Sequence, residues 1–65
     1  MIVYVNERRI EVDGQPTVAA LLQSLGFPDR GVAVALDYSV LPRSSWATEV
    51  FDGARLEVVT AVQGG

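Results

Sequence analysis

The sequence contains no cysteine, no histidine and no lysine among its 65 residues. These absences remove the usual zinc ligands, the histidine-based hydrolytic triads and the cysteine and lysine nucleophiles. The eight acidic residues show no spacing typical of a catalytic pair, and no glycine-rich loop opens a helix as a phosphate-binding motif would. We therefore expect no catalytic residue, no metal and no bound cofactor, and interpret the chain as a non-enzyme.

Basic charge and long apolar runs are also scarce. The net charge is −3, and the one adjacent basic pair is Arg8-Arg9, so a nucleic-acid partner is not expected. The longest apolar runs, 18–22 and 32–36, hold five residues each, whereas a membrane span needs about twenty. With no secretory signal visible either, we expect a cytoplasmic protein that does not enter the membrane.

What the sequence does have is a pattern of short strands around one helix. β-branched residues in 1–5 and polar-apolar alternation in 9–12 predict an opening hairpin, with a turn at 6–8 and a second turn at Asp13-Gly14. A helix then begins after Thr17, its expected N-cap, and ends at Gly26, about nine residues later. Its apolar face has helical spacing and consists of Val18, Leu21, Leu22 and Leu25.

The second half of the chain predicts three further strands. Residues 32–36 indicate a central strand that is buried on nearly both sides, and 40–43 a short edge strand ending near proline. Residues 44–48 favour one helical turn capped by a serine, and 55–60 predict the last strand. This order predicts an α+β fold, the β-grasp or ubiquitin-like roll, in which one helix packs across one face of a mixed four- to five-stranded sheet.

The chain closes on "AVQGG" directly after the last predicted strand, which divides it into a β-grasp domain at 1–60 and a flexible tail at 61–65. Five extended residues reach roughly 16–18 Å, far enough to enter the active site of a partner. Glycines at 64 and 65 leave a narrow channel unobstructed. A carboxylate reacts with nucleophiles only after activation, most simply by attack on the α-phosphate of ATP, so the partner would supply ATP and magnesium.

The missing lysines and cysteines acquire a meaning in this context. An activated acyl group on a flexible tail could be intercepted by amines or thiols of its own chain, and this chain has none except its α-amino group. We hypothesise that the absence protects the acyl group. Chance composition is the alternative.

The segments "MIVYVNERRIEV", "TVAALLQSLG", "GVAVALD", "LPRSSW" and "RLEVVTAVQGG" together resemble the ThiS-like sulfur carriers of thiamine biosynthesis over essentially the whole chain. The resemblance implies that an E1-like adenylyltransferase adenylates the Gly65 carboxylate. A cysteine desulfurase or rhodanese-type donor then supplies sulfur to give a thiocarboxylate, which thiazole synthase consumes. Gln63, Val62 and Gly64 would enter the partners' active sites, and no protease would be needed to expose Gly65.

A docking surface is expected on the sheet face opposite the helix. Alternation places Val3 and Val5 inward, so that Tyr4 points outward; by the same argument Val59 points outward. Tyr4 and Val59 could then form an exposed apolar partner patch beside the tail, although scattered apolar surface residues are normal. We interpret Trp46 as a core or lid residue.

Two other functions remain open from the sequence. A small subunit of molybdopterin synthase is a sulfur carrier of the same fold that also ends in Gly-Gly. A ubiquitin-like protein modifier or interaction module would act through isopeptide linkage or through docking alone.

Overall fold

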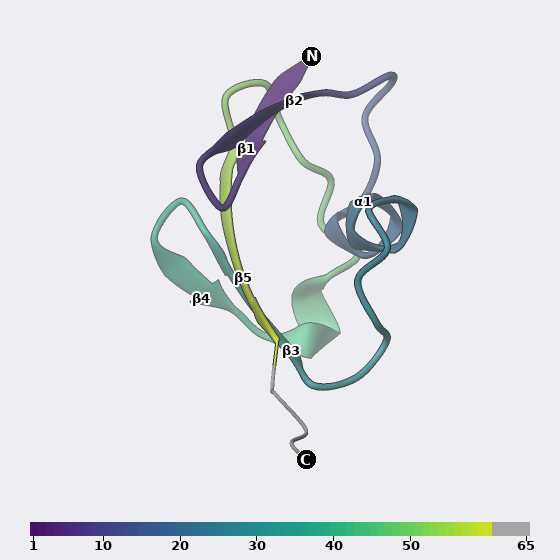
Figure 1. Cartoon of the computed structure of the whole chain (residues 1–65), viewed down its shortest axis with the longest axis vertical. Helices are drawn as coiled ribbons and strands as arrows, with labels where there is room; N and C mark the ends of the chain where they lie inside the picture. The colour runs from purple at the N-terminus through teal and green to yellow at the C-terminus, as the bar shows by residue number, and fades with distance from the viewer. Residues whose placement is uncertain (61–65) are drawn as a thin grey trace.

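The first and last strands of the chain lie side by side in the middle of a five-stranded sheet (Figure 1). The computed structural model describes residues 1–60. Its elements are β1 (Ile2–Val5), β2 (Arg8–Glu11), α1 (Val18–Ser24), β3 (Val32–Leu36), β4 (Ser39–Leu41), the 3₁₀ turn η1 (Arg43–Ser45) and β5 (Arg55–Thr60).

The sheet order is β2-β1-β5-β3-β4. β1 pairs with β2, and β3 with β4, as antiparallel hairpins, while β5 runs parallel to β1 and antiparallel to β3. The helix α1 lies on one side of this mixed sheet (Figure 1). The predicted β-grasp fold is therefore confirmed, and β4 makes the sheet five-stranded.

Both hairpins close through two residues with positive φ. These are Asn6 and Glu7, at 50° and 68°, and Asp37 and Tyr38, at 48° and 71°. Two consecutive left-handed residues are the type I′ geometry, whose twist matches that of the flanking strands. The first turn is thus one residue shorter than predicted, and β2 begins at Arg8.

The helix begins where the sequence predicts. The Thr17 side-chain oxygen accepts a hydrogen bond from the backbone N–H of Ala20 at 3.0 Å, which satisfies a donor that the first turn leaves free. Gly26 follows the helix with φ of 89°. The helix is two residues shorter than expected, because Leu25 is its C-cap. Leu25 remains 38% exposed and does not join the buried face.

The core lies between α1 and the inner face of the sheet. Val3, Leu56 and Val58 point inward from the central strands, as the alternation predicts. Trp46 is 5% exposed, its indole N–H donates to the Leu41 carbonyl at 3.3 Å, and the Arg43 guanidinium lies 4.3 Å from its ring centre. The core interpretation of Trp46 is confirmed.

Two expectations about the second half are wrong. The strand at 32–36 is an interior strand, since β3 pairs with β5 and β4, but it is not buried on both sides: Val34 is its one buried residue. The reason is that α1 covers one face of the sheet, which leaves the small Ala33 side chain exposed on the other. The turn at Arg43–Ser45 has no serine cap, because Pro42 precedes it and provides no side-chain hydrogen bond.

Candidate functional site: the end of β5 and the outer sheet face

β5 carries the chain out of the middle of the sheet. Its neighbours are β1 and β3, and it reaches Thr60 at the end of the sheet remote from Met1 (Figure 1). The predicted tail residues lie outside the described residues; they are Val62, Gln63, Gly64 and Gly65. The proposed domain boundary at 60/61 coincides with the end of the described residues. What the structure defines is therefore the anchor of the tail.

Asn6 fixes this anchor from the neighbouring hairpin. Its side-chain oxygen accepts a hydrogen bond from the Val58 N–H at 2.7 Å, and its side-chain nitrogen donates to the Val58 carbonyl at 3.2 Å. Its own backbone N–H donates to Leu56 at 2.8 Å. The amide of Asn6 thus takes the place of a further β1 residue and extends the parallel ladder along β5, two residues before Thr60.

The outer sheet face next to this anchor is apolar. Val59 lies opposite Ala33 on β3, and Val40 of β4 lies opposite Ala35. Val59 and Val40 are 66% and 82% exposed. These four residues, which we call the outer-sheet patch, line a shallow depression of about 170 Å³ with Val34 and Glu57 beside them. A contiguous apolar surface of this kind is typical of a protein-binding site.

Tyr4 lies on the same face but not beside Val59. The register places Tyr4 opposite Arg55, whose guanidinium lies 4.9 Å from the centre of the tyrosine ring. Arg55 and Val59 are four residues apart on β5, about 13 Å at the usual strand rise. The structure therefore brings Val59 together with β3 and β4 residues and leaves Tyr4 in a separate, half-buried contact with an arginine.

Sequence reasoning did not find Ala33, Ala35 and Val40. The signal was present in the run "VAVAL", where the two alanines alternate with larger residues and so share one strand face. The continuous apolar run concealed this alternation.

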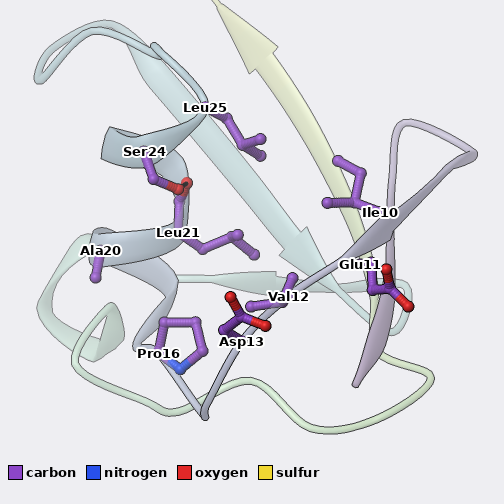
Figure 2. Close-up of a pocket in the computed structure, with 9 residues that line it drawn as sticks. All are labelled: Ile10, Glu11, Val12, Asp13, Pro16, Ala20, Leu21, Ser24 and Leu25. Atoms are coloured by element: carbon purple, nitrogen blue, oxygen red, sulfur yellow. Dashed lines mark hydrogen bonds between the residues drawn. The ribbon is translucent and has the colours of Figure 1, made fainter.

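The opposite side of the sheet has a groove between β2 and α1, with a volume of about 400 Å³. Figure 2 shows Ile10 of β2 and Leu25 at the helix end on opposite sides of it. Asp13 contributes a carboxylate near one end, whereas the Glu11 carboxylate points away from α1. The Ser24 hydroxyl donates to the Leu21 carbonyl at 2.8 Å within the helix. The groove is therefore mainly apolar and lies beside an edge strand.

The described part of the chain offers surfaces rather than a polar centre. Among residues 1–60, every buried side chain is hydrophobic, and no three His, Cys, Asp or Glu side chains gather where they could hold a metal ion. No helix in this range is long and apolar enough to cross a membrane.

The comparisons with known proteins identify the family. The ThiS family model matches residues 3–65. This chain belongs to the ThiS family, the sulfur carriers of thiamine biosynthesis. The crystal structure of the thiamine biosynthesis protein ThiS from Geobacter metallireducens is 33% identical, superposes with a TM-score of 0.83 and is covered over the full length of both chains. An NMR structure of a thiamine biosynthesis protein from the same organism gives 35% identity and a TM-score of 0.80, over all of this chain and 88% of that one.

A thiazole synthase from Paramagnetospirillum magneticum contains a similar segment. It is 38% identical over 66 residues, which cover all of this chain but 20% of the relative. The chain therefore spans about a fifth of the length of that protein. The match supports a place for the family in thiamine biosynthesis. The thiazole synthase activity in the name is that of the relative.

Proposed function

We propose that this ThiS-family chain carries sulfur as a thiocarboxylate on Gly65 and donates it to thiazole formation. The observation that carries the proposal is the extent of the family match, which runs through the Gly-Gly end to residue 65. The β5 anchor supports it, because Asn6 holds the strand from which this tail departs.

The proposed chemistry occurs in the active sites of partners. On an E1-like adenylyltransferase, the Gly65 carboxylate attacks the α-phosphate of ATP and releases pyrophosphate, which gives an acyl-adenylate. The persulfide of a cysteine desulfurase or rhodanese-type donor attacks the acyl carbon and expels AMP, and a thiol then reduces the resulting acyl disulfide to the thiocarboxylate. The thiocarboxylate gives its sulfur to thiazole synthase. The carboxylate is then regenerated. ATP and Mg²⁺ belong to the activating partner, and the chain acts as a carrier in the cytoplasm, not as an enzyme.

The outer-sheet patch would dock the partners while Val62, Gln63 and Gly64 enter their active sites. Val59 is the residue of this patch nearest to the tail in the chain, one position before Thr60, and it is 66% exposed. The neighbouring pair of Tyr4 and Arg55 would extend the contact with the partner along the same face of the sheet. An apolar patch gives affinity, and the neighbouring charged residues give orientation.

The test is to incubate the chain with ATP, Mg²⁺, the adenylyltransferase and sulfide, and to weigh the product by mass spectrometry. Exchange of one oxygen for sulfur at Gly65 is expected. Deletion of Gly65 should abolish the exchange. Val59→Asp should weaken adenylation by at least about tenfold, because it places a carboxylate in an apolar contact. Phe51→Asp is the matched control, since Phe51 is 42% exposed in the loop before β5 and lies outside the patch.

Other products would contradict the proposal in distinct ways. Attachment of the chain to lysines of other proteins indicates a modifier, and an unchanged mass with the cognate adenylyltransferase indicates an interaction module. If the thiocarboxylate forms but the chain acts as the small subunit of molybdopterin synthase and does not serve thiazole synthase, the carrier chemistry stands and the pathway is wrong.

A further inference from the structure

The two edges of the sheet differ in how well they are protected. β4 has three residues and is followed at once by Pro42, which cannot donate to a further strand. β2 has four residues, contains no proline, and continues into Val12. Unprotected edge strands are templates for pairing with another chain. The free side of β2 is therefore the more accessible of the two edges.

The hydrogen bonds to β1 identify which backbone groups of β2 face outward. The Met1 amine donates to the Val12 carbonyl at 2.9 Å, and the Val12 N–H donates to the Met1 carbonyl at 2.8 Å. In an antiparallel pair such doubly bonded positions alternate with non-bonded ones. Ile10 therefore faces β1 as Val12 does, and the N–H and C=O groups of Arg9 and Glu11 point away from the sheet.

We propose that a second copy of this chain pairs with β2 as an antiparallel strand, with Ile10 opposite Ile10 across a two-fold axis. In this register Arg9 lies opposite Glu11 of the second copy, and Glu11 lies opposite its Arg9. The outward backbone groups then pair in two doubly bonded positions, which makes four hydrogen bonds, and both side-chain pairs are oppositely charged.

Neighbouring registers are less favourable. Centring the pair on Arg9 would place two arginines opposite each other, and centring it on Glu11 would place two glutamates opposite each other. Either arrangement is destabilising. A shift by a single residue would set outward backbone groups against inward ones, and their hydrogen bonds would be lost.

The groove beside β2 supports the same arrangement. A two-fold axis perpendicular to the joined sheets places both α1 helices on one side, so that the two grooves face each other over the paired Ile10 side chains. Ile10 is only partly buried in one copy, and Leu25 is 38% exposed. Pairing would cover both. The residues of the outer-sheet patch and the end of β5 lie two to four strands away from β2, so pairing at β2 leaves them free.

A contact of this size gives a weak dimer. One four-residue edge and a shallow groove bury less than the roughly 1,200 Å² of a standard interface. We expect a dissociation constant of about 0.1–1 mM. The dimer would therefore form where the chain is concentrated, and each dimer would present two tails.

The experiment is sedimentation equilibrium, with ¹H–¹⁵N NMR, from about 20 µM to about 2 mM of the full chain, a range that brackets the expected affinity. A monomer–dimer equilibrium is expected, with concentration-dependent shifts at the amides of Arg9 and Glu11. Glu11→Arg should weaken the dimer about tenfold, since it sets arginine against arginine at two positions. The exchanged variant Arg9→Glu/Glu11→Arg should restore the affinity to within about threefold.

Three further variants separate the charge and backbone contributions. Asp29→Arg changes the net charge equally at an exposed loop position and should leave the dimer intact. Glu11→Pro removes the carboxylate and an outward N–H without touching the β1 ladder, and it should weaken the dimer more than Glu11→Ala, which removes the carboxylate alone.

Several results would overturn the proposal. The proposal is refuted if the chain stays monomeric up to the highest concentration. It is also refuted if the concentration-dependent amide shifts gather at Val40 and Val59. A failure of the exchanged variant to restore binding, or an equal effect of Asp29→Arg, refutes the Ile10-centred register. None of these outcomes bears on thiocarboxylate formation, which the mass measurement tests separately.

Discussion

Replacement of Asn6 tests whether the side chain that extends β1 holds the end of β5. Asn6→Ala removes the two hydrogen bonds to Val58, at 2.7 and 3.2 Å. At about 0.5–1.5 kcal/mol each, their loss costs about 1–3 kcal/mol. Alanine must also adopt the left-handed backbone of this position, φ of 50°, which adds about 1–2 kcal/mol.

The sum is a large fraction of the stability that a chain of this length has. Domains have about 0.05–0.15 kcal/mol of stability per residue, or roughly 3–10 kcal/mol for 65 residues. We expect Asn6→Ala to lower the free energy of unfolding by about 2–5 kcal/mol. Each kcal/mol corresponds to roughly 4–8 °C in the melting temperature. Urea denaturation followed by tryptophan fluorescence is a suitable assay, since Trp46 is buried.

Asn6→Gly is the matched control, because glycine adopts the left-handed backbone without steric cost. It should lose the hydrogen-bond contribution alone and lie between Asn6→Ala and the unchanged chain. Both variants should accelerate amide hydrogen exchange at Val58. If Asn6→Ala changes the unfolding free energy by less than about 0.5 kcal/mol, or if Val58 exchange is unaltered, the amide does not anchor β5.

Two further changes test the core and the absence of lysine. Trp46→Ala should lower the free energy of unfolding by about 3–5 kcal/mol, because it empties a buried site and leaves Arg43 without its aromatic contact. Urea denaturation followed by far-UV circular dichroism measures this loss. Trp46→Phe should lower the free energy of unfolding clearly less, and equal losses would show that ring packing is unimportant. Thr60→Lys, activated with ATP in the absence of sulfide, should lose one water as its amine attacks the acyl-adenylate and expels AMP. The unchanged chain should lose no water, because the Met1 amine lies about 26 Å from Thr60 along the parallel strands, beyond the roughly 16–18 Å that five residues can reach. A Thr60→Lys chain that keeps its full mass would refute the hypothesis that the absence of lysine protects the acyl group.

The local patterns of the sequence were sufficient for most of the fold. Thr17 caps the helix, Gly26 ends it, and β5 has the bounds that its alternation predicts. These features depend on short-range chemistry, namely a side-chain oxygen near a free N–H, a residue that tolerates positive φ, and the two-residue period of a strand.

The features that were not predicted depend on contacts between distant segments. Nothing local in 32–36 indicates that β5 rather than β3 occupies the middle of the sheet, and so the exposed alanine face was read as buried. The separation of Tyr4 from Val59 likewise follows from the parallel register of β1 and β5, which no sequence pattern specified. The proposed thiocarboxylate chemistry at Gly65 rests on the family match, because Gly65 lies outside the residues that the structure describes.

The pairing of the earliest strand with the latest has a consequence for synthesis. The two hairpins share no strand ladder with each other; β5 alone connects them, through β1 on one side and β3 on the other. The sheet can therefore close only after β5 has left the ribosome. A product that terminates before β5 would remain two unjoined hairpins and a short helix, each of them only marginally stable alone.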